Sequence, residues 1–332
     1  MLSSLSSSMS NPSSSSTQSP FSQNPETRNW LDLPPDVTST ILLKLGSIEI
    51  LNNAQRVCTQ WRTISNDPAM WHTIVMRNAY DPYEMQFDSL DKMCRHAIDR
   101  SRGNLVDITL EHFCSDDLLN YIADSTNHLN RMRLLSCNDI SEEGMIKVAK
   151  KLPLLEELDI TISNLSVDAL EVIGHCCPLL KSLKFNTQVC IHQQYASDDE
   201  AFAIAQTMPN LRHLQLFGNM LTNDGVLANL DGCPHLESLD VRQCFNVCMD
   251  GSLAKRCAEE IKDFRNPNAP TDDYEFDYEF DPEFEYEFDP EFDYEFDPVF
   301  DYGFGPRFDY DDYSSGISDT GFCDVEDYLG LL

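Results

Sequence analysis

The sequence predicts an α/β fold in which a small, all-α N-terminal module precedes a solenoid of parallel strands and helices, with disordered termini. Three observations lead to it: an apolar template that recurs six times, a helical apolar pattern before it, and low-complexity sequence at both ends. A chain of 332 residues is long enough for two or three such units. The predicted units are 1–28, a Ser-rich lead; 29–76, the helical module; 77–104, a connecting helix; 105–264, about six repeats with a closing helix; and 265–332, an acidic and aromatic tail.

Residues 1–28 are mostly Ser, Pro, Asn and Gln, which is too polar a composition to build a core and therefore predicts disorder. They lack the apolar segment of a secretory signal. No run of about eighteen apolar residues exists, so we expect no membrane span. The expected location is the nucleus, the cytoplasm or both.

The segment 30–71 has the apolar spacing of a small helical bundle. Leu33 and Pro34 lead into a helix whose first turn holds Pro35 and Asp36, both favourable there. Two sets of apolar residues at helical spacing follow: Val37, Ile41, Leu42 and Leu45, then Ala54, Val57, Cys58 and Trp61. Because so short a bundle cannot cover its own core, we expect the module to bind a partner.

The template L-x-x-L-x-L, with other apolar residues allowed in the Leu positions, starts at six sites: Leu105, Leu129, Leu155, Leu180, Leu211 and Leu236. The spacings between successive starts are 24, 26, 25, 31 and 25 residues. Within each copy the last two apolar positions alternate with polar residues, as in a strand with one buried face, and a helical pattern follows most copies. A strand and helix repeating every 20–29 residues or so are the signature of leucine-rich repeats, whose stacked units share one core. Residues 252–261 have the pattern of a closing helix.

The N-terminal module resembles the F-box in four segments: Leu-Pro at 33–34, Ile-Leu-x-x-Leu at 41–45, Val-Cys-x-x-Trp-Arg at 57–62 and Pro-x-x-Trp at 68–71. From there to about residue 266 the chain resembles the plant F-box/leucine-rich-repeat (F-box/LRR) proteins, in segments such as 90–101, 151–160 and 213–219. The sequence departs from the pattern at 45–57, where many F-boxes carry a Pro and an Asp-Leu pair.

In that family the F-box binds the Skp-type adaptor of an SCF-type cullin-RING ubiquitin ligase, and the repeats hold a protein substrate. The resemblance therefore implies a substrate-recognition subunit that is not an enzyme, uses no cofactor, and reaches the cullin and RING subunits through the adaptor. The residues that it matches to adaptor contacts, or to their supports, are Leu33, Pro34, Ile41, Leu42, Leu45, Val57, Cys58 and Trp61.

The strands of such a solenoid line its concave side, and residues between the apolar positions point outward from the core. The candidate substrate-binding residues are therefore Arg131, Arg133, Leu135, Glu157, Asp159, Lys184, His213, Phe217, Asp240 and Arg242. We expect Leu135 and Phe217 to be exposed and to anchor a partner, because apolar groups in a polar surround form interface hot spots. Charges alternate in sign between repeats, which disfavours a polyanionic ligand.

The net charge of −33 is concentrated at the C-terminal end, where residues 267–332 carry 22 acids and one base. An acidic chain repels phosphate backbones, so we expect no nucleic-acid partner. The sequence holds no Gly-rich phosphate loop and no H-E-x-x-H, G-x-S-x-G or C-x-x-C motif. The cluster His175–Cys177 lacks a second pair of ligands, so no metal site is predicted.

Phenylalanine recurs every four residues from Phe276 to Phe308, with acids between, and regularly placed prolines interrupt this strand-like alternation. Prolines and repelling acids predict a disordered tail. Three roles for it are open: a solubilising extension, a recognition segment for a basic partner, and a pseudo-substrate that folds against Arg131, Arg133 and Lys184. For the whole chain, a repeat scaffold outside any ligase and an acidic-tail chaperone for basic proteins are the alternatives.

Overall fold

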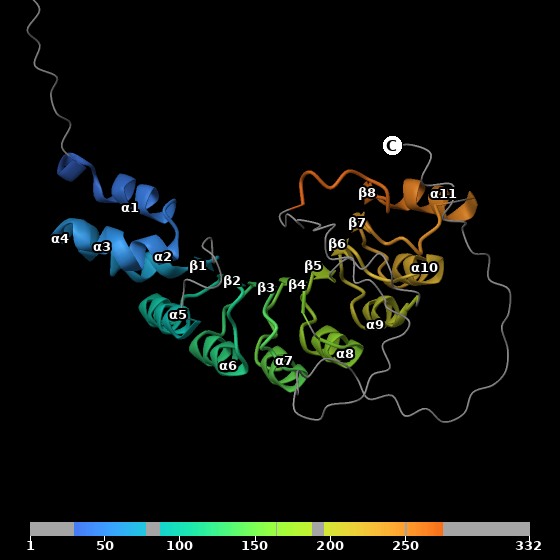
Figure 1. Cartoon of the computed structure of the whole chain (residues 1–332), viewed down its shortest axis with the longest axis horizontal. Helices are drawn as coiled ribbons and strands as arrows, with labels where there is room; N and C mark the ends of the chain where they lie inside the picture. The colour runs from blue at the N-terminus through green and yellow to red at the C-terminus, as the bar shows by residue number, and fades with distance from the viewer. Residues whose placement is uncertain (1–29, 78–86, 164, 188–195, 250, 275–332) are drawn as a thin grey trace, which may run out of the picture.

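The computed structural model describes residues 30–77, 87–163, 165–187, 196–249 and 251–274. These residues form an arch, with a helical module at the N-terminal end, strands along the inner side and helices along the outer side (Figure 1). The predicted disordered lead, and the tail from residue 275 on, lie outside the described residues.

The N-terminal module is built from short helical segments. They are η1 (Trp30–Asp32), α1 (Pro35–Leu43), α2 (Ser47–Glu49), the π-helical η2 (Ile50–Ala54), α3 (Gln55–Val57), α4 (Thr59–Ser65) and the 3₁₀ segment η3 (Pro68–Trp71). The stretch that departs from the F-box pattern thus folds as α2, η2 and α3 in succession. The expected continuous helix over 54–61 is wrong, because Cys58 is extended (φ −155°, ψ 172°) and separates α3 from α4. The Trp61 N–H donates a 3.4 Å hydrogen bond to Cys58 Sγ, which caps α4.

The solenoid alternates strands and helices in chain order. Its strands are β1 (Thr73–Met76), β2 (Asp107–Glu111), β3 (Arg131–Leu135), β4 (Glu157–Thr161), β5 (Ser182–Asn186), β6 (His213–Gln215), β7 (Ser238–Asp240) and β8 (Asp263–Arg265). Its helices are α5 (Phe87–Ser101), α6 (Asp116–Ser125), α7 (Glu142–Ala149), α8 (Val167–Cys176), α9 (Asp199–Thr207), α10 (Asn223–Gly232) and α11 (Gly251–Glu260). The six predicted strands and the closing helix are confirmed.

All eight strands are parallel and form one sheet in the order β1 to β8. The register is constant, so that Asp107, Arg131, Glu157, Ser182 and His213 lie side by side as first residues of their strands. The longer spacing of 31 residues between Leu180 and Leu211 does not change this register. Because the second residue of each of these strands points into the core, one apolar layer runs the length of the arch: Ile74, Ile108, Met132, Leu158, Leu183, Leu214 and Leu239.

Two strands lie outside the six predicted repeats. Strand β1 belongs to the N-terminal module, where Ile74 and Met76 are buried and Thr73 and Val75 are exposed, and it pairs with β2. The helical module and the solenoid therefore share one sheet and one hydrophobic core.

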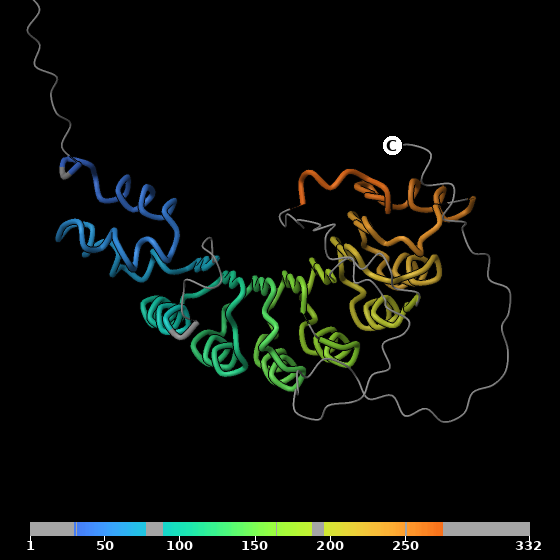
Figure 2. Tube along the Cα trace, viewed as in Figure 1, coloured from blue at the N-terminus to red at the C-terminus, as the bar shows by residue number. Residues whose placement is uncertain are grey.

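At the other end, β8 crosses the predicted boundary between residues 264 and 265. The chain then turns back above the inner side of the strands as far as Tyr274 (Figure 2). The first ten residues of the predicted tail are thus part of the fold, because their contacts with the repeats, described below, give them an ordered position. Among the described helices none is both long enough and apolar enough to span a membrane.

Candidate functional site: an apolar face and a concave polar face

The N-terminal module leaves much of its apolar surface uncovered. The exposed fractions of the large apolar side chains are 60% for Trp30, 40% for Val37, 49% for Leu43, 44% for Leu45 and 65% for Val57. Helix α1 turns Thr38 and Leu42 inward, so its Val37 and Leu43 face away from the core. Several large exposed apolar side chains within so short a module indicate an interaction surface.

The residues predicted to contact the adaptor divide by exposure. Pro34, Leu45 and Val57 are exposed, and the half-buried ones are Leu33, Ile41, Cys58 and Trp61. Leu42 has no exposed surface because it packs in the core of the module. The expectation that Leu42 contacts a partner is therefore wrong; it supports helix α1, which carries Ile41. Trp30, which sequence reasoning missed, packs edge-on against Trp61 with ring centroids 6.4 Å apart.

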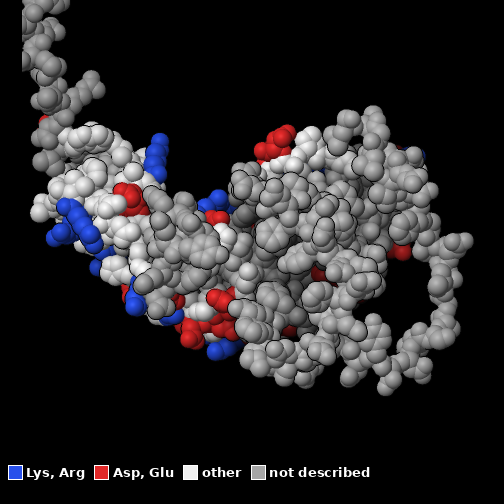
Figure 3. Space-filling model, viewed as in Figure 1, with Lys and Arg blue, Asp and Glu red and all other residues white. Residues whose placement is uncertain are grey.

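On the concave face, charged residues of neighbouring strands pair with one another. Arg131 lies 3.0 Å from Asp107 and 3.9 Å from Glu157, which joins the first residues of β2, β3 and β4. Among the third residues of the strands, Asp159 forms a 3.0 Å ion pair with Arg133 and lies 3.8 Å from Lys184. The charges alternate in sign from repeat to repeat. Because the register is constant, opposite charges therefore lie side by side on adjacent strands and pair. Seen from the side of the arch, basic and acidic side chains also lie near one another on the exposed part of the N-terminal half (Figure 3).

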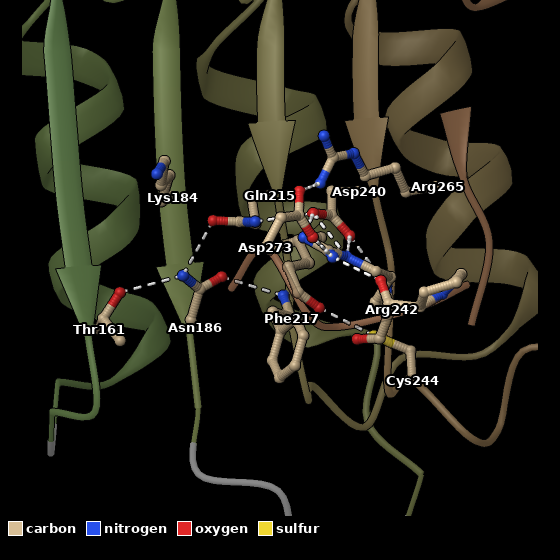
Figure 4. A network of polar contacts seen from close by, with 12 residues as sticks. Thr161, Lys184, Asn186, Gln215, Phe217, Asp240, Arg242, Cys244, Arg265 and Asp273 are labelled. Carbon is tan, nitrogen blue, oxygen red and sulfur yellow. Dashed lines mark hydrogen bonds and ion pairs between the residues drawn. The ribbon is translucent and has the colours of Figure 1, made fainter. Parts of the chain in front are cut away.

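A hydrogen-bonded network continues the concave face toward the C-terminal repeats (Figure 4). The Asn186 amide donates to Thr161 Oγ1 (3.0 Å) and to Gln215 Oε1 (3.2 Å), and its oxygen accepts from the Phe217 N–H (3.0 Å). Gln215 in turn donates to Asp240 Oδ2 at 2.7 Å. Four strands are thus tied together by side chains on one face.

Arg242 ends this network as a buried cation. Only 2% of the residue is exposed, and its guanidinium donates to both carboxylate oxygens of Asp240 at 2.8–3.1 Å. It also donates to Asp273 Oδ1 (2.5 Å) and to the carbonyl oxygen of Pro270 (2.8 Å), which lie in the segment after β8. A buried charge needs such partners, because its desolvation is otherwise very unfavourable.

The segment after β8 also supplies an aromatic contact. The ring of Tyr274 stacks on that of Phe217, with centroids 3.8 Å apart and planes inclined by 8°. Phe217 is 2% exposed and Leu135 is fully buried, so the expectation of two exposed anchors is wrong for both. Asp159, Asp240 and Arg242 are buried as well. The alternation of apolar and polar residues along a strand predicts which side chains lie on the concave face. It does not predict their exposure, because the curvature of the sheet brings neighbouring side chains on that face close together. Of the other candidates, Arg131, Glu157 and His213 are exposed and Arg133 and Lys184 are half-buried.

Between these rows lies a cavity of about 280 Å³ on the concave face, lined by residues from β3 to β8 and by Asp273 and Tyr274. Among the described residues no cluster of His, Cys, Asp and Glu is arranged to hold a metal ion. Burial raises the pKa of the Cys94, Cys137 and Cys244 thiols to about 12, so these thiols stay protonated at neutral pH.

Comparison with known proteins agrees with this architecture. A family model described as F-box-like matches residues 30–77, and a leucine-rich repeat model matches residues 207–228. The Arabidopsis thaliana F-box protein SKIP19 is 50% identical over 243 residues, which cover 73% of this chain and 78% of that protein. Two putative F-box/LRR-repeat proteins of the same plant, numbers 21 and 23, are 46% and 49% identical; the alignments cover 76% and 74% of this chain and 86% and 55% of theirs.

Among solved structures, the leucine-rich repeat protein LegL7 of Legionella pneumophila aligns over 52% of this chain and 57% of its own, with a TM-score of 0.36 and 19% identity. SKIP19 and F-box/LRR-repeat protein 21 are 50% and 46% identical to this chain over about three quarters of its length. The chain therefore belongs to the family of plant F-box/LRR-repeat proteins.

Proposed function

We propose that the chain is the substrate-recognition subunit of an SCF-type cullin-RING ubiquitin ligase. Its F-box binds a Skp-type adaptor, which connects it to the cullin and RING subunits, and its concave face binds a protein substrate. The observation that carries the proposal is the uncovered apolar face of the F-box, because Leu45 and Val57 are exposed at positions that the family pattern matches to adaptor contacts.

The chain contributes proximity rather than chemistry. A substrate held on the concave face stays near the ubiquitin-charged enzyme of the assembly, which raises the effective concentration of its lysines there. The chain needs no catalytic residue or cofactor for this task. The same proposal places it in the nucleus, the cytoplasm or both, which imaging of a fluorescently tagged full chain tests.

Co-purification with a Skp-type adaptor tests the adaptor contact. Val57→Asp and Leu45→Asp each put a charge on the apolar face, since Val57 is 65% and Leu45 44% exposed and neither belongs to the buried core. Loss of a central interface residue weakens binding by about 2–4 kcal/mol, or about 30- to 700-fold in Kd. The matched control is Phe245→Asp, because Phe245 is a 55% exposed apolar residue far along the repeats.

The expected result is a 1:1 complex of the natural chain and of the Phe245 variant, which the two F-box variants fail to form. Absence of a complex between the natural chain and any Skp-type adaptor would overturn the proposal and favour a repeat scaffold that acts outside a ligase. Equal binding by all four chains would show that another surface holds the adaptor.

A further inference from the structure

The segment after β8 occupies one end of the concave cavity through two adjacent side chains. The Asp273 carboxylate pairs with Arg242 at 2.5 Å through one oxygen and with Arg265 through the other. The Tyr274 ring lies flat on Phe217, and the Arg242 guanidinium lies 5.7 Å from the Phe217 ring centroid and 6.0 Å from that of Tyr274. A carboxylate held by two guanidiniums beside a stacked aromatic ring is a recognition geometry with charge and shape specificity.

We propose that Phe217, Arg242 and Arg265 form a binding site for an acidic residue followed by tyrosine. Asp273–Tyr274 is its intramolecular ligand, and a partner carrying an Asp-Tyr or Glu-Tyr segment binds by displacing it. The inference rests on the proposed function only in calling that partner a substrate. The binding site itself can be tested without the ligase.

The charge of the cavity fits an acidic ligand. When Asp273 is set aside, its lining holds four basic side chains, Arg133, Lys184, Arg242 and Arg265, and three acidic ones, Asp159, Asp240 and Asp263. A cationic excess in a chain of net charge −33 attracts an acidic segment selectively. The cavity continues from Tyr274 to Lys184 and Arg133, which gives room for further residues of a bound segment.

The contacts of Asp273 and Tyr274 can be exchanged for those of another segment. Asp273 remains 55% exposed, and both residues meet the repeats through their side chains. The backbone ladder of the sheet ends earlier, at the bond from the Gln243 N–H to the Pro267 carbonyl (2.9 Å), so the sheet is complete without them.

The sequence repeats the same ligand. Asp-Tyr recurs at 277–278, 293–294, 301–302, 309–310, 312–313 and 327–328, and Glu-Tyr occurs at 285–286. These copies share the chemistry of the bound dipeptide and lie on the same chain, so each is a competitor for the site. A tethered competitor has an effective concentration of the order of 1 mM, which lowers the apparent affinity for any partner in solution.

Binding of a fluorescein-labelled peptide of residues 268–277 (NAPTDDYEFD) to the full chain, followed by fluorescence anisotropy, measures this competition. The host variant replaces by Ser the Tyr of the seven Asp-Tyr dipeptides and of the one Glu-Tyr dipeptide: Tyr274, Tyr278, Tyr286, Tyr294, Tyr302, Tyr310, Tyr313 and Tyr328. If the peptide binds the host with a Kd of about 30 µM, a competitor at about 1 mM predicts about 30-fold weaker binding to the natural chain.

Arg265→Gln in the host identifies the site. Arg265 is 38% exposed at its side chain, so its replacement spares the core while removing a partner of the carboxylate. We expect at least about tenfold weaker peptide binding, in line with loss of a charge-assisted hydrogen bond. Arg212→Gln is the matched control, because Arg212 is exposed and pairs with Glu237 outside the cavity. Equal affinity of the peptide for natural chain and host, or no effect of Arg265→Gln, would overturn the inference.

Hydrogen–deuterium exchange in the natural chain gives a second test that needs no folded variant. Excess unlabelled peptide is expected to speed exchange of the amides in residues 266–274, where the Tyr274 N–H donates to the Thr271 carbonyl at 2.8 Å. The same peptide with Asn for Asp273 and Ala for Tyr274 is expected to have no effect. Unchanged exchange with the natural peptide would mean that the segment only caps the solenoid. Adaptor binding on the same samples separates the two proposals, because it depends on the F-box alone.

Discussion

Asn186 joins three neighbouring strands through its side chain, so Asn186→Ala is expected to lower the free energy of unfolding of the full chain by about 3 kcal/mol. The residue is 4% exposed and makes three side-chain hydrogen bonds, one of which it accepts from the buried Phe217 N–H. Leaving a buried N–H unsatisfied costs about 1–3 kcal/mol. The other two bonds add about 0.5 kcal/mol each, at the low end of the usual range. After the substitution the Thr161 hydroxyl still donates to Asp159, and the Gln215 amide nitrogen still donates to Asp240.

Thermal unfolding followed by circular dichroism measures this loss. For a chain of this size about 3 kcal/mol corresponds to a fall in Tm of about 6–12 °C. The matched control is Asn210→Ala, because the exposed Asn210 makes one comparable bond, to the Pro178 carbonyl at 3.1 Å. A change within about 0.5 kcal/mol is expected for it, as for surface substitutions generally. A loss below about 1 kcal/mol for Asn186→Ala would refute the reasoning, since it would mean that the Phe217 N–H finds another acceptor.

Four further predictions concern individual side chains. Cys58→Ser is expected to stabilise the F-box by up to about 1 kcal/mol in chemical denaturation, because a hydroxyl caps helix α4 better than a thiol does; destabilisation would contradict this. Gly232→Ala is expected to lower stability by at least about 2 kcal/mol in the same assay, because its Cβ would lie 2.3 Å from a backbone oxygen of α9. At pH 7, maleimide labelling followed by mass spectrometry should modify the half-buried Cys176 and spare the buried thiols Cys94, Cys137 and Cys244, whose pKa is about 12. Hydrogen bonds from Arg242 and Arg265 lower the pKa of Asp273 from 3.8 to about 2. The contact of Asp273 with these arginines is therefore fully present above pH 3.8 and is lost as the pH falls through about 2. The protection of residues 266–274 from hydrogen exchange, corrected for the intrinsic exchange rate, is expected to stay constant from pH 7 to about pH 4.

The repeat architecture was predictable because its core residues recur at a fixed spacing. Each L-x-x-L-x-L template contains the second strand residue that is buried in the structure, such as Leu158 or Leu183, and the Pro that follows each of α7 to α10 marks the return to the sheet. The alternation also assigned the correct face to Arg133, Asp159 and Lys184. It could not give their burial, because exposure on a concave face depends on how closely adjacent strands bring their side chains together.

The ends of the solenoid were not predicted, for two different reasons. Strand β1 has only Ile74 and Met76 at buried positions and lacks the Leu template, so its pairing with β2 shows only when the register is known. Asp273 and Tyr274 share the composition of the tail that follows them. Nothing in the local sequence distinguishes them. They are ordered by two guanidiniums, that of Arg242 two residues after β7 and that of Arg265 in β8, which folding brings near them.

Strand β1 makes the F-box and the repeats one rigid body, and this fixes a length within the molecule. Strands in a sheet lie about 4.8 Å apart, so the Asp273 end of the cavity, six to seven strands from β1, lies about 30 Å along the sheet. A linker would let a bound partner sample many distances from the adaptor. A shared sheet holds the distance between the F-box and the Asp273 end of the cavity nearly constant. In the proposed ligase, the lysines within reach would then be selected by their distance from the Asp-Tyr segment as well as by their sequence.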